Sequence, residues 1–94
     1  MNSKFHLKIQ ERGGVLYEGD VSSITSLNDT GEFDVLPDHA NFISLIKGKV
    51  VVREVGKDSK DITFDNALMR VANNLVEIYI GVERVLDNES KASD

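Results

Sequence analysis

The chain has 94 residues, no cysteine and a formal net charge of −5. This length suits a single domain, and the missing cysteines exclude disulfides, zinc–thiolate sites and a cysteine nucleophile. The acidic balance argues against nucleic-acid binding, which needs a basic face, and against docking on anionic lipid. No apolar run approaches the ~20 residues of a membrane span, so we expect no direct insertion into lipid.

The predicted elements are short strands, because 11 Val and 7 Ile stand against only 4 Ala. Apolar and polar residues alternate with the period of a strand in most of the chain. About ten segments carry this strand character: 4–10, 15–18, 21–27, 32–36, 42–46, 49–55, 61–65, 68–71, 75–80 and 82–86. Their spacing of roughly 8–12 residues predicts an all-β sandwich or barrel over residues 1–86. Residues 87–94 form a polar C-terminal tail.

Turn residues separate these segments. Gly13–Gly14 and residues 28–31 (Asn-Asp-Thr-Gly) are strong turn signals, and Lys47–Gly48 predicts a further turn. Asn66–Ala67 precedes one predicted strand, and Asn73–Asn74 precedes the next. The apolar spacing within 21–27 departs from the strict period of two, which is compatible with a β-bulge.

Residues for catalysis or metal binding are sparse. The two histidines, His6 and His39, lie 33 residues apart on a predicted strand and in a predicted loop, so a surface role is favoured over a metal site. Glu32 and Asp34 share one strand face, as a glycosidase pair could, but no tryptophan provides a platform for sugar stacking. We therefore expect no active site, no metal and no cofactor.

Four acids lie within ten residues, at Asp29, Glu32, Asp34 and Asp38, with no Lys or Arg among them. A turn and the polar face of one strand would present them together. A solvated strand edge whose charges block edge-to-edge pairing is one interpretation. The other is a docking patch for a basic partner, followed by Pro37 and by His39 in a loop held by the strands.

This segment also carries a resemblance. Residues 30–40, Thr-Gly-Glu-Phe-Asp-Val-Leu-Pro-Asp-His-Ala, resemble the Glu-Gly-Glu-Phe-Gly-hydrophobic-Leu-Pro-Gly-His-Ala signature of the epsilon subunit of F-type ATP synthases. Further matches run in the family's order along most of the chain: 5–9, 14–19, 21–27, 45–48, 68–71 and 75–80. The departures are Asp34 and Asp38 where the family often has Gly, Asn41 for a Pro, and Asn66–Ala67 for Gly-Gly. Because Asn and Asp tolerate the left-handed region, we expect the turns to survive.

The resemblance implies a flattened, mostly antiparallel β-sandwich of ten strands that acts as a non-catalytic rotor subunit. Such a domain links the gamma subunit to the membrane c-ring and so couples proton flow to ATP synthesis. It is peripheral, on the cytoplasmic face of the bacterial inner membrane or the equivalent organelle face, and we expect the isolated chain to be a monomer. The expected docking residues are Gly31, Glu32, Asp34, Asp38, His39 and Phe42.

The family also has a C-terminal helical hairpin that inhibits hydrolysis and, in some members, binds ATP. The chain ends where that hairpin would begin, so we expect neither inhibition nor nucleotide binding. The alternative to a rotor subunit is a free-standing β-sandwich that binds a sugar or another small ligand.

Overall fold

The computed structural model describes residues 2–81, which form seven strands and no helix. The strands are β1 (Phe5–Glu11), β2 (Gly14–Val21), β3 (Ser23–Asn28), β4 (Gly31–Val35), β5 (Phe42–Arg53), β6 (Lys60–Ala72) and β7 (Leu75–Ile80). Only β1 and β7 pair in parallel among these strands, and the other pairs are antiparallel. The prediction of an all-β, mostly antiparallel fold is confirmed. Within residues 2–81 there is no helix long and apolar enough to cross a membrane.

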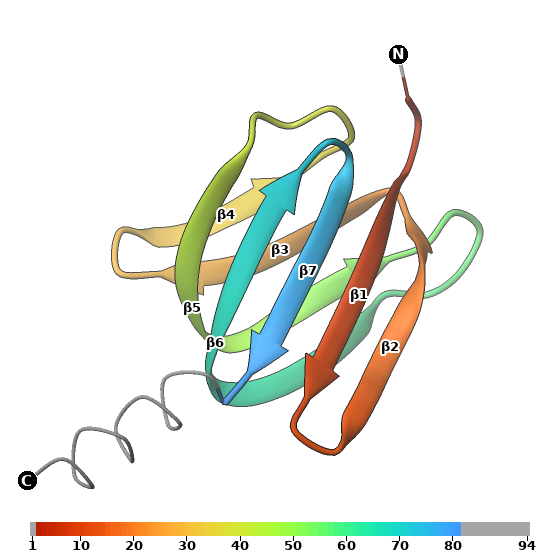
Figure 1. The fold of residues 1–94 in the computed structure, drawn as a ribbon. Helices are drawn as coiled ribbons and strands as arrows, with labels where there is room; N and C mark the ends of the chain where they lie inside the picture. Colours follow the sequence, from red (N-terminus) through yellow and green to blue (C-terminus); the bar gives the residue numbers. More distant parts are fainter. Residues whose placement is uncertain (1, 82–94) are drawn as a thin grey trace, which may run out of the picture.

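The strands are hydrogen-bonded in the order β2-β1-β7-β6-β5-β3-β4. The long β5–β6 hairpin bends, so that its two halves lie in different layers of a sandwich (Figure 1). The front layer holds β2, β1 and β7 with the far end of β6 and the start of β5, and the rear layer holds β3 and β4 with the remaining halves. The register of the hairpin shifts between Lys47 and Gly48. Irregularities of this kind let a strand turn from one layer into the other.

The strand count differs from the expected ten. The predicted turn at Lys47–Gly48 is a bend inside β5, where Gly48 adopts a φ of 86° that a side chain would resist. The predicted break at Asn66–Ala67 is wrong, because β6 runs through it and Ala67 is fully buried. Each of these long strands therefore replaces two predicted ones. The predicted strand at 82–86 and the tail at 87–94 lie outside the described residues, as does the end of the proposed domain.

One core fills the space between the layers. Alternate residues of β1 point into it, so Leu7 and Ile9 are fully buried while Lys8 between them is partly exposed. Burying such a side chain stabilises the fold by about 1.5–3 kcal/mol. All seven strands contribute to the core, which consists of Phe5, Leu7, Ile9, Val21, Ile24, Val35, Ile46, Val50, Val52, Ala67, Met69, Val71, Val76 and Ile78.

Two local predictions agree with the structure. A register irregularity lies between Ser26 and Leu27, within the segment where a bulge was expected. Asn73 and Asn74 form the two-residue turn between β6 and β7, with φ values of 53° and 63°. Two successive residues of positive φ make the tight turn that matches strand twist, and asparagine tolerates that conformation.

Candidate docking site

The β3–β4 turn places the first two expected docking residues at one end of β4. Gly31 opens the strand with a φ of 120°, which favours glycine. Glu32 follows and is exposed. The Asn28 side chain closes the turn by accepting hydrogen bonds from the backbone N–H and the hydroxyl of Thr30, at 2.9 and 2.7 Å. Glu32 therefore directly follows a turn that is closed by side-chain hydrogen bonds.

Asp38 lies beyond the other end of β4, in the loop of residues 36–41. Its φ of 62° is left-handed, as the position of a family glycine suggested. Its backbone N–H donates to the side-chain oxygen of Asn74 at 2.9 Å. Its carboxylate accepts hydrogen bonds from the backbone and side-chain nitrogens of Asn2, both at 2.8 Å, and these bonds lower its pKa. Asp38 thus joins the loop to the N-terminal segment.

The four acids do not share one surface patch. Asp29 lies before β4 and Asp38 after it, and a strand of this length separates its ends by about 13 Å. Asp29 is also paired with a cation that is distant in the sequence, because its Oδ1 lies 3.6 Å from the Nζ of Lys47 in β5. The β3–β4 turn and the loop of residues 36–41 instead lie at opposite ends of β4, and both adjoin the first half of β5 (Figure 1).

Asp34 points to the outer face of β4, where it meets β3. It accepts a hydrogen bond from the hydroxyl of Thr25, and Arg53 donates to the same hydroxyl at 2.8 Å. Thr25 is largely buried beneath these two side chains, although it faces outward. Asp34 is therefore already engaged in a polar chain across β4, β3 and β5, whereas the structure gives Glu32 no such partner among residues 2–81.

An aromatic chain ties the loop to the sandwich. The ring of His39 packs against Phe42 with their centroids 5.2 Å apart, and Phe42 meets Phe33 edge-to-face at 6.0 Å. Phe33 and Phe42 in turn pack against the buried core. The exposed His39 therefore sits on a rigid support, which favours defined contacts with a partner.

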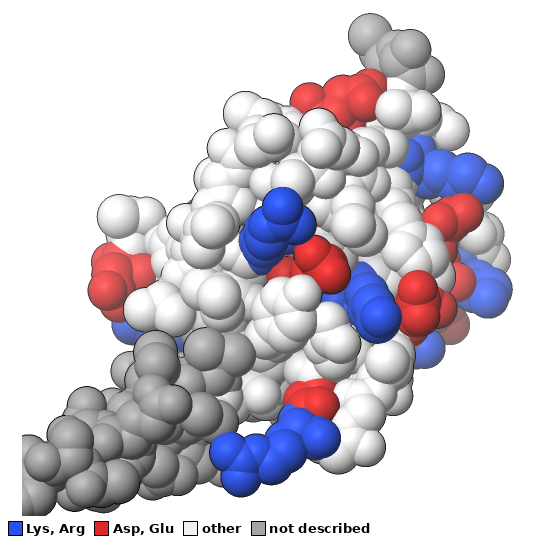
Figure 2. Space-filling model, in the orientation of Figure 1, with Lys and Arg blue, Asp and Glu red and all other residues white. Residues whose placement is uncertain are grey.

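The first half of β5 adds an apolar strip that adjoins the β3–β4 turn and the loop of residues 36–41 (Figure 1). Ile43 is 66% exposed and Leu45 is 54% exposed. Figure 2 shows few charges over this part of the front layer, while Lys, Arg, Asp and Glu intermix over β1 and β2. The expected docking residue Phe42 begins this strip but is itself half-buried.

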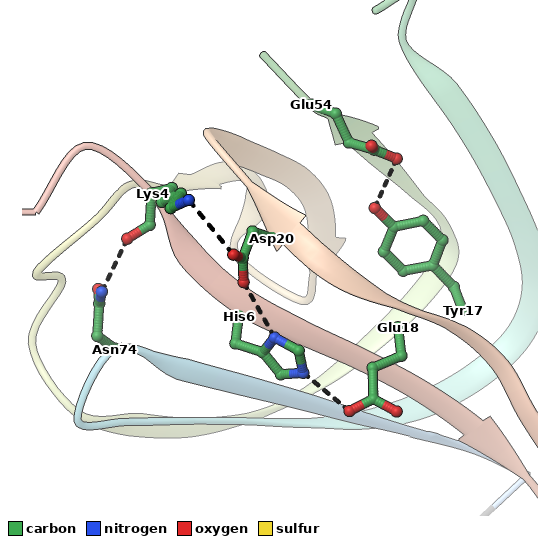
Figure 3. Close-up of polar contacts among 7 residues, drawn as sticks. All are labelled: Lys4, His6, Tyr17, Glu18, Asp20, Glu54 and Asn74. Atoms are coloured by element: carbon green, nitrogen blue, oxygen red, sulfur yellow. Dashed lines mark hydrogen bonds and ion pairs between the residues drawn. The ribbon is translucent and has the colours of Figure 1, made fainter.

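A polar cluster that the sequence analysis does not predict lies on the outer face of β1 and β2 (Figure 3). His6 lies between two carboxylates, with Nε2 2.8 Å from Glu18 and Nδ1 3.1 Å from Asp20. These hydrogen bonds raise the pKa of His6, and the bond to Glu18 has the largest effect. The same bonds lower the pKa values of Glu18 and Asp20. Lys4 approaches Asp20 at 3.5 Å. The period of two places these residues on one face but does not reveal their pairing.

A second contact joins β2 to the end of β5. The hydroxyl of Tyr17 donates to Glu54 at 2.7 Å (Figure 3). The Lys60 ammonium lies 5.1 Å from the centre of the Tyr17 ring. Burial and this hydrogen bond raise the pKa of Tyr17 to about 12. In the described part of the chain, no group of three or more His, Cys, Asp or Glu side chains could hold a metal ion.

Comparison with known proteins identifies a family. Residues 4–82 match the family described as the ATP synthase delta/epsilon chain, β-sandwich domain. The match covers the seven strands described above.

Relatives named ATP synthase epsilon chain are similar in sequence. One from Nitratiruptor sp. is 34% identical over 88 residues, which cover 88% of this chain and 68% of the relative. One from Campylobacter curvus is 40% identical over 63 residues, 67% of this chain and 49% of the relative. The chain thus spans about two thirds of the first relative and about half of the second.

The fold also recurs in solved structures. A chain of the Euglena gracilis mitochondrial ATP synthase, in a structure of its OSCP, F1 and c-ring, matches 85% of this chain with a TM-score of 0.79 and 18% identity. A chain of the Tetrahymena thermophila central stalk and c-ring matches 80% with a TM-score of 0.66 and 17% identity. These matches cover 52% and 61% of the solved chains.

Proposed function

The chain belongs to the family of ATP synthase delta/epsilon chain β-sandwich domains, and we propose that it is a non-catalytic rotor subunit of an F-type ATP synthase. In this role it links the gamma subunit to the c-ring and transmits rotation between proton flow and ATP synthesis. It acts as a peripheral subunit at the membrane face that carries the catalytic part of the enzyme. Family membership favours this function over a free-standing sandwich that binds a small ligand.

The observation that carries the proposal is the surface around the first half of β5. The β3–β4 turn carries Glu32, the loop of residues 36–41 carries His39, and the first half of β5, which adjoins both (Figure 1), exposes Ile43 and Leu45. Charged groups at a rim orient a partner but contribute little affinity, whereas apolar contact supplies most of it. This combination suits a partner with a basic region beside an apolar one.

The six expected docking residues take different roles in this proposal. Glu32 meets basic residues in the polar loops of the c-ring, and Gly31 gives the turn its shape. Asp34 and Asp38 hold their strand and loop in place through hydrogen bonds. His39 and Phe42 form the aromatic end of the surface.

The test reverses the charge of Glu32 in the full chain. Glu32→Lys should weaken binding to a reconstituted complex of gamma and c-ring several-fold, mainly through slower association, and the wild-type rate should fall as salt rises. Glu11→Lys is the matched control, because Glu11 is also exposed but lies at the distant end of β1, beside the β1–β2 turn. Equal binding by wild type, Glu32→Lys and Glu11→Lys would remove the acidic docking role.

The same complex tests the function itself. A wild-type chain that binds neither gamma nor the c-ring would contradict the rotor proposal as a whole. Coupling of ATP hydrolysis to proton pumping, measured in vesicles with and without the chain, should increase when it is added.

A further inference from the structure

The first half of β5 is a free sheet edge. Residues 42–46 pair with β6, whereas β3 joins β5 only from Lys47 onward. Within residues 2–81, this segment therefore has a strand on one side alone. An edge of this kind presents backbone N–H and C=O groups that can pair with another strand.

The other free edges of the described sandwich carry charged side chains, which discourage such pairing. β2 contains Glu18 and Asp20, and β4 contains Glu32 and Asp34. The first residues of β6, which pair with β5 alone, include Lys60 and Asp61. The segment 42–46 has the sequence Phe-Ile-Ser-Leu-Ile and no charge, glycine or proline.

The exposed side chains of this edge are apolar. Ile43 and Leu45 project from the outer face, 66% and 54% exposed, and the register places Leu45 opposite Leu68 of β6. β2 also exposes apolar side chains, at Val15 and Leu16, but it combines them with two acids. The edge at 42–46 is thus the unprotected one in the described part of the chain.

We propose that residues 42–46 receive an extended, uncharged strand of the gamma partner, which adds to the front layer by backbone pairing and covers Ile43 and Leu45. This mode of recognition takes its affinity from main-chain hydrogen bonds and its specificity from alternate side chains. The inference rests on the proposed rotor function and specifies how that function obtains its affinity.

Charge selects the occupant. A second copy of this chain would bring another net charge of −5 to the edge, and like charges oppose such association. The same net charge of −5 favours a strand that is flanked by basic residues. A heterologous partner therefore fits this edge better than a self-associated dimer.

The first arm of the test places a charge on the edge. Ile43→Lys and Leu45→Lys should each weaken binding of the full chain to purified gamma subunit at least tenfold, because a lysine must be desolvated beside an incoming strand. Val55→Lys is the control, because Val55 is 75% exposed but lies in the β5–β6 loop. Because all three side chains are exposed, the three variants should melt at the temperature of the wild type. This measurement checks that the variants are folded.

The second arm measures backbone pairing by amide hydrogen exchange. Within residues 42–46, the backbone amides that point away from β6 should exchange rapidly in the isolated chain and become protected when gamma binds. The amides of β2 should not change. Two results would overturn the strand addition and leave the rotor function standing: wild-type binding that Ile43→Lys and Leu45→Lys do not affect, or wild-type binding that leaves the amides pointing away from β6 unprotected. Protection of those same amides in the isolated chain, or dimerisation through this edge, would also overturn it.

Discussion

The carboxylate of Asp38 accepts two hydrogen bonds from Asn2, one from the backbone N–H and one from the side-chain amide, both at 2.8 Å. Asn74 completes this junction. Its side chain accepts from the Asp38 N–H at 2.9 Å and donates to the Lys4 carbonyl at 2.8 Å. Three distant segments of the chain are thus pinned together at the loop that carries His39, which limits the freedom that this loop would lose on binding.

The first prediction concerns Asn74, which combines two side-chain hydrogen bonds with a left-handed backbone. Asn74→Gly should lower the free energy of unfolding by about 1–2 kcal/mol, because it removes both bonds. Asn74→Ala should cost about 1 kcal/mol more, because alanine resists the left-handed region. Urea denaturation measures both values.

Asn73→Gly is the control for this pair, because Asn73 shares the left-handed turn but the structure gives its side chain no hydrogen bond within residues 2–81. It should unfold close to wild type. Identical unfolding of Asn74→Ala and Asn74→Gly would show that backbone strain at this turn is unimportant.

Much of the fold follows from local patterns in the sequence. The alternation in β1 and β4 predicts their inner and outer faces, and residues 28–31 predict the turn between β3 and β4. The strand count could not be obtained in the same way. Glycine is typical of turns between strands, but Gly48 lies at a bend within β5 where the strand passes from one layer to the other. Whether a glycine forms a turn or a bend depends on the strands packed around it.

The arrangement of the candidate site residues was harder to predict from the sequence, for a physical reason. Four acids close in sequence seemed to form one face, but Pro37 and the left-handed Asp38 carry the chain away from the line of β4. The partners of Asp38 and His6 lie 36 and 12–14 residues away along the chain. Such contacts arise from the packing of distant strands, and no local period encodes them.

The second prediction is a pH dependence of stability due to His6. Because its pKa is raised in the folded chain, its contribution is complete below the usual value of 6.5 and is lost as the pH rises through the folded value. The pKa values of Glu18 and Asp20 are lowered, so their contribution is present above 4.5 and 3.8 and is lost as the pH falls through the folded values. Stability from this cluster is therefore greatest between these ranges.

Thermal melting from pH 3 to 9 checks this dependence. The melting temperature should fall by less than about 5 °C between pH 6 and 8, because exposed ion pairs contribute little. Lys4 and Lys8 flank His6 on its own side of the cluster, while its partner on β7, Leu75, is apolar. His6→Gln should flatten the curve above pH 6, and an unchanged curve would assign the dependence to other groups.

The third prediction concerns Thr25, whose hydroxyl connects Asp34 and Arg53. Thr25→Val preserves the shape of the side chain but removes both hydrogen bonds, and it should lower the free energy of unfolding by about 1–2 kcal/mol because Thr25 is 7% exposed. Amides of β4 should also exchange faster, since this contact holds the strand to β3. Ser23→Ala is the control, because Ser23 accepts from Arg53 at the longer distance of 3.4 Å. If both variants unfold alike, the polar chain adds nothing to the edge strand, and the orientation of Glu32 depends on the β3–β4 turn alone.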